Sequence, residues 1–273
     1  FAAPNVIPRE LWKLNAARTA IEFTHNGGFQ PGKIYEIVYP ARDPWLIGLG
    51  PTAIRDFISF LKYGGQGHWL MADQTRFLKR AIGFGSSQSG RFLRTFLYQG
   101  FNVDEKGKKI FDGVYANVAG AGRGSFNHRF AQPSRDGHPT FNFFYPSDLY
   151  PFTDVPTADA ETGANEGLLD KARAQNAVPK IFYTNGSYEY WGRAASLIHT
   201  TPDGKRDVET APETRVYYIA GTQHGPGAWP PAKSDLRKNL GNSVNHRPIL
   251  RALLVDLNDW IKDGTAPPAS VFP

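Results

Sequence analysis

The feature that most restricts the fold is a short serine-rich turn between an apolar run and an amphipathic run. Residues 81–84 (AIGF) have the pattern of a buried strand, and residues 91–97 (RFLRTFL) have that of a helix with one apolar face. The turn between them, 85–89, reads GSSQS. A strand that turns sharply into a helix with a serine at the turn has the construction of a nucleophile elbow, which holds one hydroxyl clear of a sheet.

Steric demand selects Ser87 among the three serines of this turn. An elbow packs the start of its helix closely against the end of its strand, so the residues two before and two after the nucleophile must be small. Ser87 has Gly85 and Ser89 at those positions. Either neighbouring serine would place an arginine or a phenylalanine there. A serine- and glycine-rich loop without chemistry is the alternative interpretation.

Strand patterns alternate with helical patterns along much of the chain. Strands are expected at 33–41, 81–85, 111–120, 180–184 and 214–221, and helices at 51–64, 91–100, 193–199 and 248–261. Such alternation predicts an α/β fold whose mostly parallel sheet is covered by helices on both faces. In such a sheet ligands bind at the carboxyl ends of the strands, so chemistry is expected just after each strand.

Length and composition are those of a folded domain. A chain of 273 residues with 41% hydrophobic residues can bury a large core, and we expect one domain over residues 1–273. Residues 123–178 interrupt the alternation with many prolines, glycines and aromatics, and this long irregular segment is expected to be a lid-like insertion.

Charge and cysteine content exclude several classes of function. The formal charge is +6, but the 31 basic and 25 acidic residues are interspersed, so nucleic-acid binding is not favoured. The absence of cysteine excludes disulfides, thiolate catalysis and cysteine-based metal sites. No apolar stretch approaches the roughly 20 residues that a membrane span needs. The chain begins at Phe1, and we expect any signal peptide to have been removed already.

A histidine that could act as the base follows the last predicted strand. His224 lies three residues after TRVYYIAG, in a loop rich in glycine and proline, where it could take the serine proton and return it to a leaving group. A surface-loop histidine without a role is the alternative. The other six histidines fit less well by their positions: His25, His68, His128, His138, His199 and His246.

The same rule selects Glu189 as the acid. It follows the strand KIFYT (180–184), in what is expected to be a loop, and a carboxylate there would orient the imidazole and stabilise the imidazolium. A surface or ion-paired glutamate is the alternative. Four aspartates are alternatives for the acid, with Asp154 the second choice: Asp148, Asp154, Asp203 and Asp207.

The three candidates stand in the chain order nucleophile, acid, base, which is the order of α/β-hydrolases. The backbone N–H of Gln88, the residue after the nucleophile, is expected to supply one donor of an oxyanion hole. For the second donor the stretch His25-Asn26-Gly27-Gly28 has a suitable composition, but it lies very close to the next predicted strand. The second donor is therefore left open.

Longer motifs extend the pattern over nearly the whole chain: KIYEIVYPARDP, GLGPTAIRDFISFLKYG, GFGSSQSGRFLRTFLYQGFN, GAGRGSFNHRF, PSDLYPFTD, YEYWGR, AGTQHG and DWIKDGTAPPAS. In these stretches the sequence resembles the alpha/beta-hydrolase-domain family of largely uncharacterised, often exported bacterial and fungal proteins. The resemblance implies an α/β-hydrolase fold and esterase-like chemistry. By matching motif, it implies the same three residues, Ser87 in GSSQSGR, Glu189 in YEYWGR and His224 in GTQHG.

Members of that family are longer at both ends, so the resemblance also implies a missing N-terminal segment or a partner chain. Their frequent export implies an extracellular or periplasmic location. We expect the present chain to hold the middle and C-terminal part of such a protein.

The expected function is hydrolysis of a carboxylic ester through an acyl-enzyme, with neither cofactor nor metal. The substrate would be a small-molecule or polymer-derived ester, and Tyr190, Trp191 and Trp229 could line its pocket, although aromatics are more often core residues. Two alternatives stay open: an amidase or peptidase of the same fold, and a non-catalytic carbohydrate- or polymer-binding protein. Residues 120–124 (GAGRG) lack the spacing of a nucleotide-binding loop, so a sharp turn is expected there.

Overall fold

The structure is a computed structural model, and it describes residues 5–24, 27–33, 35–37, 39–64, 78–127, 148–235 and 238–273. The chain divides into two compact units, Phe1–Pro44 and Trp45–Pro273. The smaller unit contains the 3₁₀ turn η1 (Arg9–Leu11) and an antiparallel pair, β1 (Trp12–Leu14) with β2 (Ile21–Phe23). Three aromatic rings pack edge to face beside this pair: Phe23, Phe29 and Tyr35.

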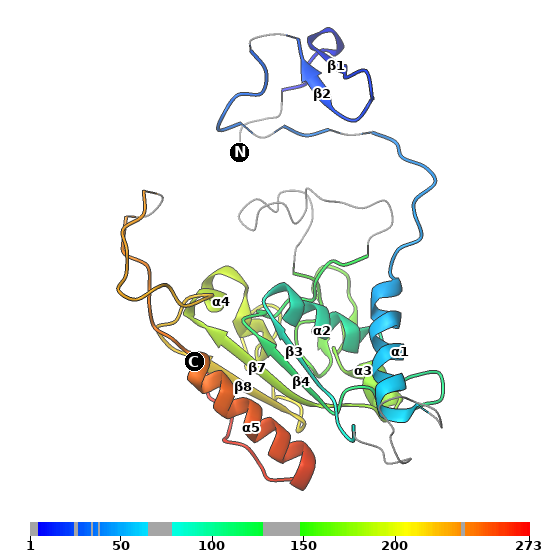
Figure 1. The fold of residues 1–273 in the computed structure, drawn as a ribbon, viewed down its shortest axis with the longest axis vertical. Coiled ribbons are helices and arrows are strands. Elements are labelled where there is room, and N and C mark those ends of the chain that lie inside the picture. The colour runs from blue at the N-terminus through cyan, green and yellow to red at the C-terminus, as the bar shows by residue number, and fades with distance from the viewer. Residues whose placement is uncertain are drawn as a thin grey trace. The chain divides into compact units, whose positions relative to one another are not determined.

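The larger unit is built on a parallel sheet of four strands, in the order β3-β4-β7-β8 (Figure 1). Its members are β3 (Ile82–Ser86), β4 (Gly113–Asn117), β7 (Lys180–Gly186) and β8 (Thr214–Ile219). Because the spatial order follows the chain order, each connection carries the chain one strand further across the sheet. The carboxyl ends of all four strands therefore meet along one edge, where the sequence places its candidate residues.

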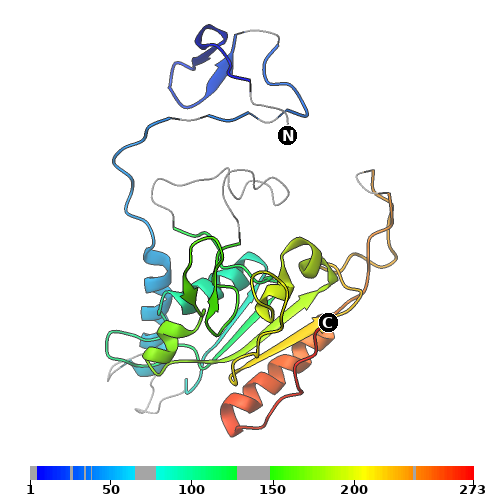
Figure 2. The ribbon, with the colours of Figure 1, turned by 180° about the vertical axis from the view of Figure 1, so that it is seen from behind.

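Helices cover both faces of this sheet, as the sequence predicts. The helix α2 (Gln88–Tyr98) lies on one face with the short α3 (Asp170–Ala174), and α5 (Arg247–Asp263) lies on the other (Figures 1 and 2). Successive strand residues point to opposite faces. Val114 thus joins the core under α2, whereas Tyr115 joins the cluster under α5.

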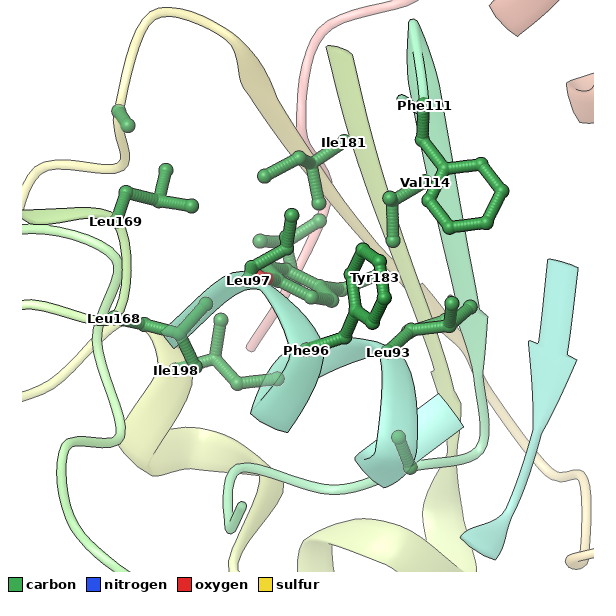
Figure 3. Close-up of a cluster of buried hydrophobic side chains, with 14 of the residues drawn as sticks. Leu93, Phe96, Leu97, Phe111, Val114, Leu168, Leu169, Ile181, Tyr183 and Ile198 are labelled. Atoms are coloured by element: carbon green, nitrogen blue, oxygen red, sulfur yellow. The ribbon is translucent and has the colours of Figure 1, made fainter. Parts of the chain in front are cut away.

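The larger core lies between α2 and the sheet. Leu93, Phe96 and Leu97 come from one face of α2 and pack with Ile181 and Tyr183 of β7 (Figure 3). The second cluster joins Tyr115, Phe182 and Tyr217 of the strands to Leu253, Leu257 and Trp260 of α5. Burial of these side chains on two faces fixes the sheet and hence the edge at which its strands end.

Most predicted elements are present, with small shifts at their ends. The helix predicted at 51–64 is α1 (Leu49–Tyr63), which ends at Gly64. The prediction of a helix at 193–199 is wrong in position, because α4 spans Ser187–Gly192 and only a 3₁₀ turn, η4 (Ala195–Ile198), follows it. The sequence SYEYWG did not predict this helix because its aromatic and glycine residues have low helix propensity. Tertiary packing overrides that propensity in the folded protein.

The strand predicted at 33–41 is not formed in its described residues. This stretch has strong β propensity, but Ile37 and Tyr39 are largely exposed and no strand pairs with it in the described part of the chain. Propensity alone does not make a strand, because its backbone groups need a partner and its side chains a surface to pack on.

The segment predicted as a lid lies partly outside the described residues, which omit 128–147. Its described part contains a two-residue antiparallel pair, β5 (Thr157–Ala158) with β6 (Asn165–Glu166), followed by α3. A role as a lid and a single domain over 1–273 stay predictions. Among the described residues, none of the helices has the length and apolar character to pass through a bilayer.

A buried histidine links η4 to the C-terminal segment. The His199 ring stacks on Phe272 with centroids 4.0 Å apart, and its Nε2 lies 3.0 Å from the Tyr190 hydroxyl. Burial lowers the pKa of His199 below its ordinary value, and the negative charge of Asp207 opposes this only in part. The fold therefore favours the neutral form of His199 over the charged form.

We predict that His199 makes the fold less stable in mild acid. Below the ordinary histidine pKa of 6.5 the unfolded chain takes up a proton that the folded chain resists, so the free energy of unfolding falls as the pH falls. Urea unfolding of wild type and His199→Gln between about pH 7 and about pH 5 measures this. The wild type should lose more stability than the variant, and parallel losses would contradict the prediction.

Candidate active site

Ser87 lies in the strained turn that the sequence predicts. It has φ 58° and ψ −120°, outside the regions that a residue with a side chain normally adopts. Such strain persists only where the surroundings enforce it. The Ser87 N–H donates to the Asn117 carbonyl at 2.8 Å, and the Ser87 carbonyl accepts from the Arg91 N–H at 3.1 Å as α2 begins.

Two glycines make this turn possible. A Cβ on Gly85 would lie 2.4 Å from the Ser89 carbonyl oxygen, and one on Gly90 would lie 2.9 Å from the Ala119 Cβ. The requirement for a small residue two positions before Ser87 is therefore real. On the helix side, Gly90 allows α2 to pack against the end of β4.

Ser87, His224 and Glu189 form one hydrogen-bonded chain. The Ser87 Oγ lies 2.8 Å from the His224 Nε2, and the His224 Nδ1 lies 2.6 Å from the Glu189 Oε1. These residues are far apart in sequence and follow three different strands, β3, β8 and β7. The Glu189 side chain is fully buried, whereas the His224 side chain is 41% exposed, so the chain runs from the interior to the surface.

Glu189 is fixed by the helix on which it lies. It occupies the third position of α4, and its Oε2 accepts the Gly186 N–H at 2.8 Å. An acidic side chain at this position that reaches back to the residue before the helix satisfies an otherwise unpaired backbone donor and suits the positive helix end. One carboxylate oxygen thus caps α4 while the other faces His224. The expectation of a loop at Glu189 is wrong for the same reason.

The loop that carries His224 is held by residues without any sequence signal. The Gly227 N–H donates to the Asn242 carbonyl at 2.7 Å, and the Asn242 side chain donates to the Gly221 carbonyl at 2.7 Å. The Gly221 N–H donates to the Ser187 hydroxyl at the start of α4. The Tyr188 ring packs edge-on against the His224 ring at 5.4 Å. These contacts hold the imidazole between α4 and its own loop.

Asn117, at the end of β4, is a further residue that sequence reasoning missed. Its carbonyl accepts the Ser87 N–H, its amide donates to the Ser86 hydroxyl at 3.0 Å, and its amide oxygen accepts the Thr184 hydroxyl at 2.8 Å. It therefore ties its own strand, β4, to both of β4's neighbours, the elbow strand β3 and β7. A polar residue at the end of an apolar strand is the one signal that could have pointed to it.

The predicted oxyanion donor and the aromatic residues have different surroundings. Gln88 is the first residue of α2, where backbone N–H groups have no acceptor within the helix. Tyr190 points into packed structure, with its hydroxyl on His199 and its ring 4.9 Å from Tyr218, and burial raises its pKa. Trp191 and Trp229 are 92% and 80% exposed.

The other candidates are placed elsewhere or lie outside the described residues. Asp154 is buried and accepts hydrogen bonds from Tyr183 at 2.7 Å and Thr214 at 2.6 Å, and burial raises its pKa. Asp203 caps a local turn, and Asp207 is exposed. Outside the described residues lie His25, Asn26, His68, His128 and His138, so the second oxyanion donor stays undetermined. Throughout the described ranges, no three His, Asp or Glu side chains gather as a metal ion would require.

We predict that Gly85→Ala destabilises the protein by about 1–3 kcal/mol. The added methyl group would clash with backbone atoms of Ser89 and Gly90, which cannot move aside by changing a side-chain rotamer. Gly50→Ala is the matched control, since a Cβ there meets nothing within 4 Å. The control should be neutral or slightly stabilising. Denaturant unfolding of both variants measures the difference, and equal stability would mean that the turn is looser than described.

Comparison with known proteins places this geometry in a family. Neither the curated proteins nor the solved structures contained a match to the chain. A family model described as an alpha/beta hydrolase domain does match, over residues 29–272. This range contains the sheet, both helix layers and all three members of the hydrogen-bonded chain. The protein therefore belongs to the alpha/beta hydrolase domain family.

Proposed function

We propose that this protein is a serine hydrolase that cleaves carboxylic esters through an acyl-enzyme, with Ser87 as nucleophile, His224 as base and Glu189 as acid. The observation that carries the proposal is the continuous hydrogen-bonded chain from Ser87 Oγ through the imidazole to a buried carboxylate, with its serine at a strained turn. Membership of a hydrolase family supports the reaction class. The choice of an ester as substrate is the finer part of the proposal.

In the first step the Ser87 oxygen attacks the ester carbonyl. The His224 Nε2, 2.8 Å away, accepts the hydroxyl proton as the new C–O bond forms. This role requires the neutral tautomer with its proton on Nδ1, and the Glu189 oxygen at 2.6 Å favours that tautomer. The same carboxylate stabilises the imidazolium that results.

The negative charge of the tetrahedral intermediate needs donors near the helix start. The Gln88 N–H is the donor that the turn offers, and the amino end of α2 adds a favourable dipole. Collapse of the intermediate breaks the ester C–O bond, and the imidazolium gives its proton to the departing alkoxide. Water then attacks the acyl-enzyme with His224 again as base, which releases the acid and restores Ser87.

The exposed tryptophans favour one competing function, a non-catalytic protein that binds carbohydrate or polymer. Trp191 lies on α4 two residues beyond Glu189, and Trp229 lies five residues beyond His224, so both follow the proposed triad closely. A hydrolase can use the same side chains to hold an apolar substrate. Chemical reactivity of Ser87 separates the two functions.

We predict that Ser87→Ala lowers kcat on p-nitrophenyl esters by at least about a thousandfold, because both acylation and deacylation pass through this oxygen. Ser89→Ala, in the same turn, is the matched control and should keep its activity. A fluorophosphonate probe should label wild type and Ser89→Ala but not Ser87→Ala, as read by intact mass. A wild type that stays unlabelled would favour the binding protein. Faster turnover of amide substrates than of ester substrates would favour an amidase.

We predict that Glu189→Gln lowers kcat by about 10²- to 10⁴-fold, because an amide neither stabilises the charged imidazolium nor enforces the required tautomer of the neutral imidazole. Glu189→Asp should also lose activity, since a side chain shorter by one methylene does not span both Gly186 and His224. The exposed Glu209→Gln is the control. Steady-state kinetics on one ester measures all three, and full activity of Glu189→Gln would remove this residue from the mechanism.

A further inference from the structure

A short helix with exposed aromatic side chains borders the proposed triad. The helix α4 begins directly after β7, so it stands at the edge where the strands of the sheet end (Figure 1). Its Glu189 side chain is fully buried, whereas Tyr188 and Trp191 are 41% and 92% exposed. Residues three apart on a helix are neighbours on its surface. The helix therefore buries the proposed acid on one side and presents an aromatic face on another.

The Tyr188 ring is held between the proposed base and a glycine. Its centroid lies 5.4 Å from that of the His224 ring, at an interplanar angle of 62°. A Cβ on Gly192 would lie 3.1 Å from the Tyr188 Cζ and 3.4 Å from its hydroxyl oxygen, so a side chain there would press on the ring. Gly192 follows Trp191 directly. The ring thus forms a wall beside His224 that continues along α4 toward Trp191.

The chemistry of the proposed reaction decides which part of an ester meets this wall. In the tetrahedral intermediate the reacting carbon carries the Ser87 oxygen, the oxyanion, the leaving oxygen and the acyl chain. The oxyanion faces the start of α2, where the Gln88 N–H is the proposed donor. The leaving oxygen takes its proton from the His224 Nε2, so it must come within hydrogen-bond reach of that nitrogen.

Only one direction at the reacting carbon is then left for the acyl chain, and it points away from the proton donor. The alcohol part of the ester is attached to the leaving oxygen, so it lies beside the imidazole. Tyr188 packs against that same imidazole. The aromatic face of α4 is therefore on the alcohol side of the scissile bond.

The chemical character of this face favours a ring in the alcohol. An exposed tryptophan standing alone needs no explanation, but Trp191 adjoins a ring that packs on the proposed base. Because Trp191 is 92% exposed, nearly its whole indole is free to be covered, and removing apolar surface from water is favourable. Aromatic pairs gain further from stacked or edge-to-face geometry, beyond the area that they bury.

We propose that Tyr188 and Trp191 form the subsite for the alcohol part of the substrate, and that the preferred alcohol carries an aromatic ring, as benzyl alcohol does. The inference rests on the proposed function and specifies its substrate class. It assigns the ring to the leaving part of the ester and not to the acyl part that stays on Ser87.

The test compares two isomeric esters, benzyl acetate, whose ring is in the alcohol, and methyl phenylacetate, whose ring is in the acyl part. Trp191→Ala should lower kcat/KM for benzyl acetate by about two- to tenfold, as one aromatic contact provides, and leave that for methyl phenylacetate unchanged. Trp191→Phe, which keeps a ring, should retain part of the activity that Trp191→Ala loses. The intrinsic reactivity of each ester is the same for every variant, so it cancels from these ratios.

Trp45→Ala is the matched control, because it removes a tryptophan that precedes α1 and is 90% exposed. It should match wild type on both esters. Equal losses of Trp191→Ala on the two esters, a loss confined to methyl phenylacetate, or no loss at all would overturn the subsite.

Hydrolysis of p-nitrophenyl acetate separates a failure of the subsite from a failure of the proposed function. If this hydrolysis depends on Ser87, the proposed function keeps its support in each of those cases. If wild type cleaves p-nitrophenyl acetate in this way but leaves benzyl acetate intact, the subsite alone is overturned. Absence of any Ser87-dependent hydrolysis would remove the proposed function and the subsite with it.

Discussion

The site depends on one buried carboxylate. Glu189 has no exposed surface, and an ionised group there is tolerated only when its oxygens are paired. One oxygen accepts the backbone N–H that opens α4, and the other meets His224. The same side chain therefore fixes where α4 begins and how the imidazole is turned. His224 is oriented from the interior, although its own side chain is 41% exposed.

The parallel sheet makes this pairing possible because its strands end along one edge. β3 delivers Ser87, β7 delivers Glu189 and β8 delivers His224. The remaining strand, β4, supplies no member of the hydrogen-bonded chain, but its last residue, Asn117, contacts both neighbouring strands. Asn117 accepts the Ser87 N–H and donates to Ser86, which holds the elbow to β4, and it accepts the Thr184 hydroxyl, which holds β4 to β7.

Sequence reasoning singled out Ser87, Glu189 and His224, which the structure joins by hydrogen bonds, because it used a rule of topology instead of local propensity. Small residues around Ser87 and the positions of Glu189 and His224 after apolar strands are visible without coordinates.

Sequence reasoning failed where contacts between distant residues decide the local structure. The stretch 33–41 has the composition of a strand and no partner among the described residues, and Glu189 was assigned to a loop although its own side chain caps a helix. Tyr190, a candidate for lining the pocket or for the core, has its hydroxyl on His199, a contact that no local pattern indicates. Asn117 and Asp148 have roles that come only from residues distant in sequence, so no local pattern predicts them.

The polar residues of α2 show how one helix holds both the core and the site. Its apolar face packs on the sheet, while Arg91 and Arg94, three residues apart, reach the segment that contains Asp148 and Asp154. Arg94 is fully buried and donates to the Phe152 and Ala121 carbonyls at 2.5 and 2.8 Å. The Asp154 carboxylate accepts hydrogen bonds from the Tyr183 and Thr214 hydroxyls. Arg94 and Asp154 therefore both attach the segment 148–154 to the core. Asp148, six residues earlier in the same segment, is thereby held in place over Gly122. The helix that begins just after Ser87 therefore also anchors the segment that contains Asp148.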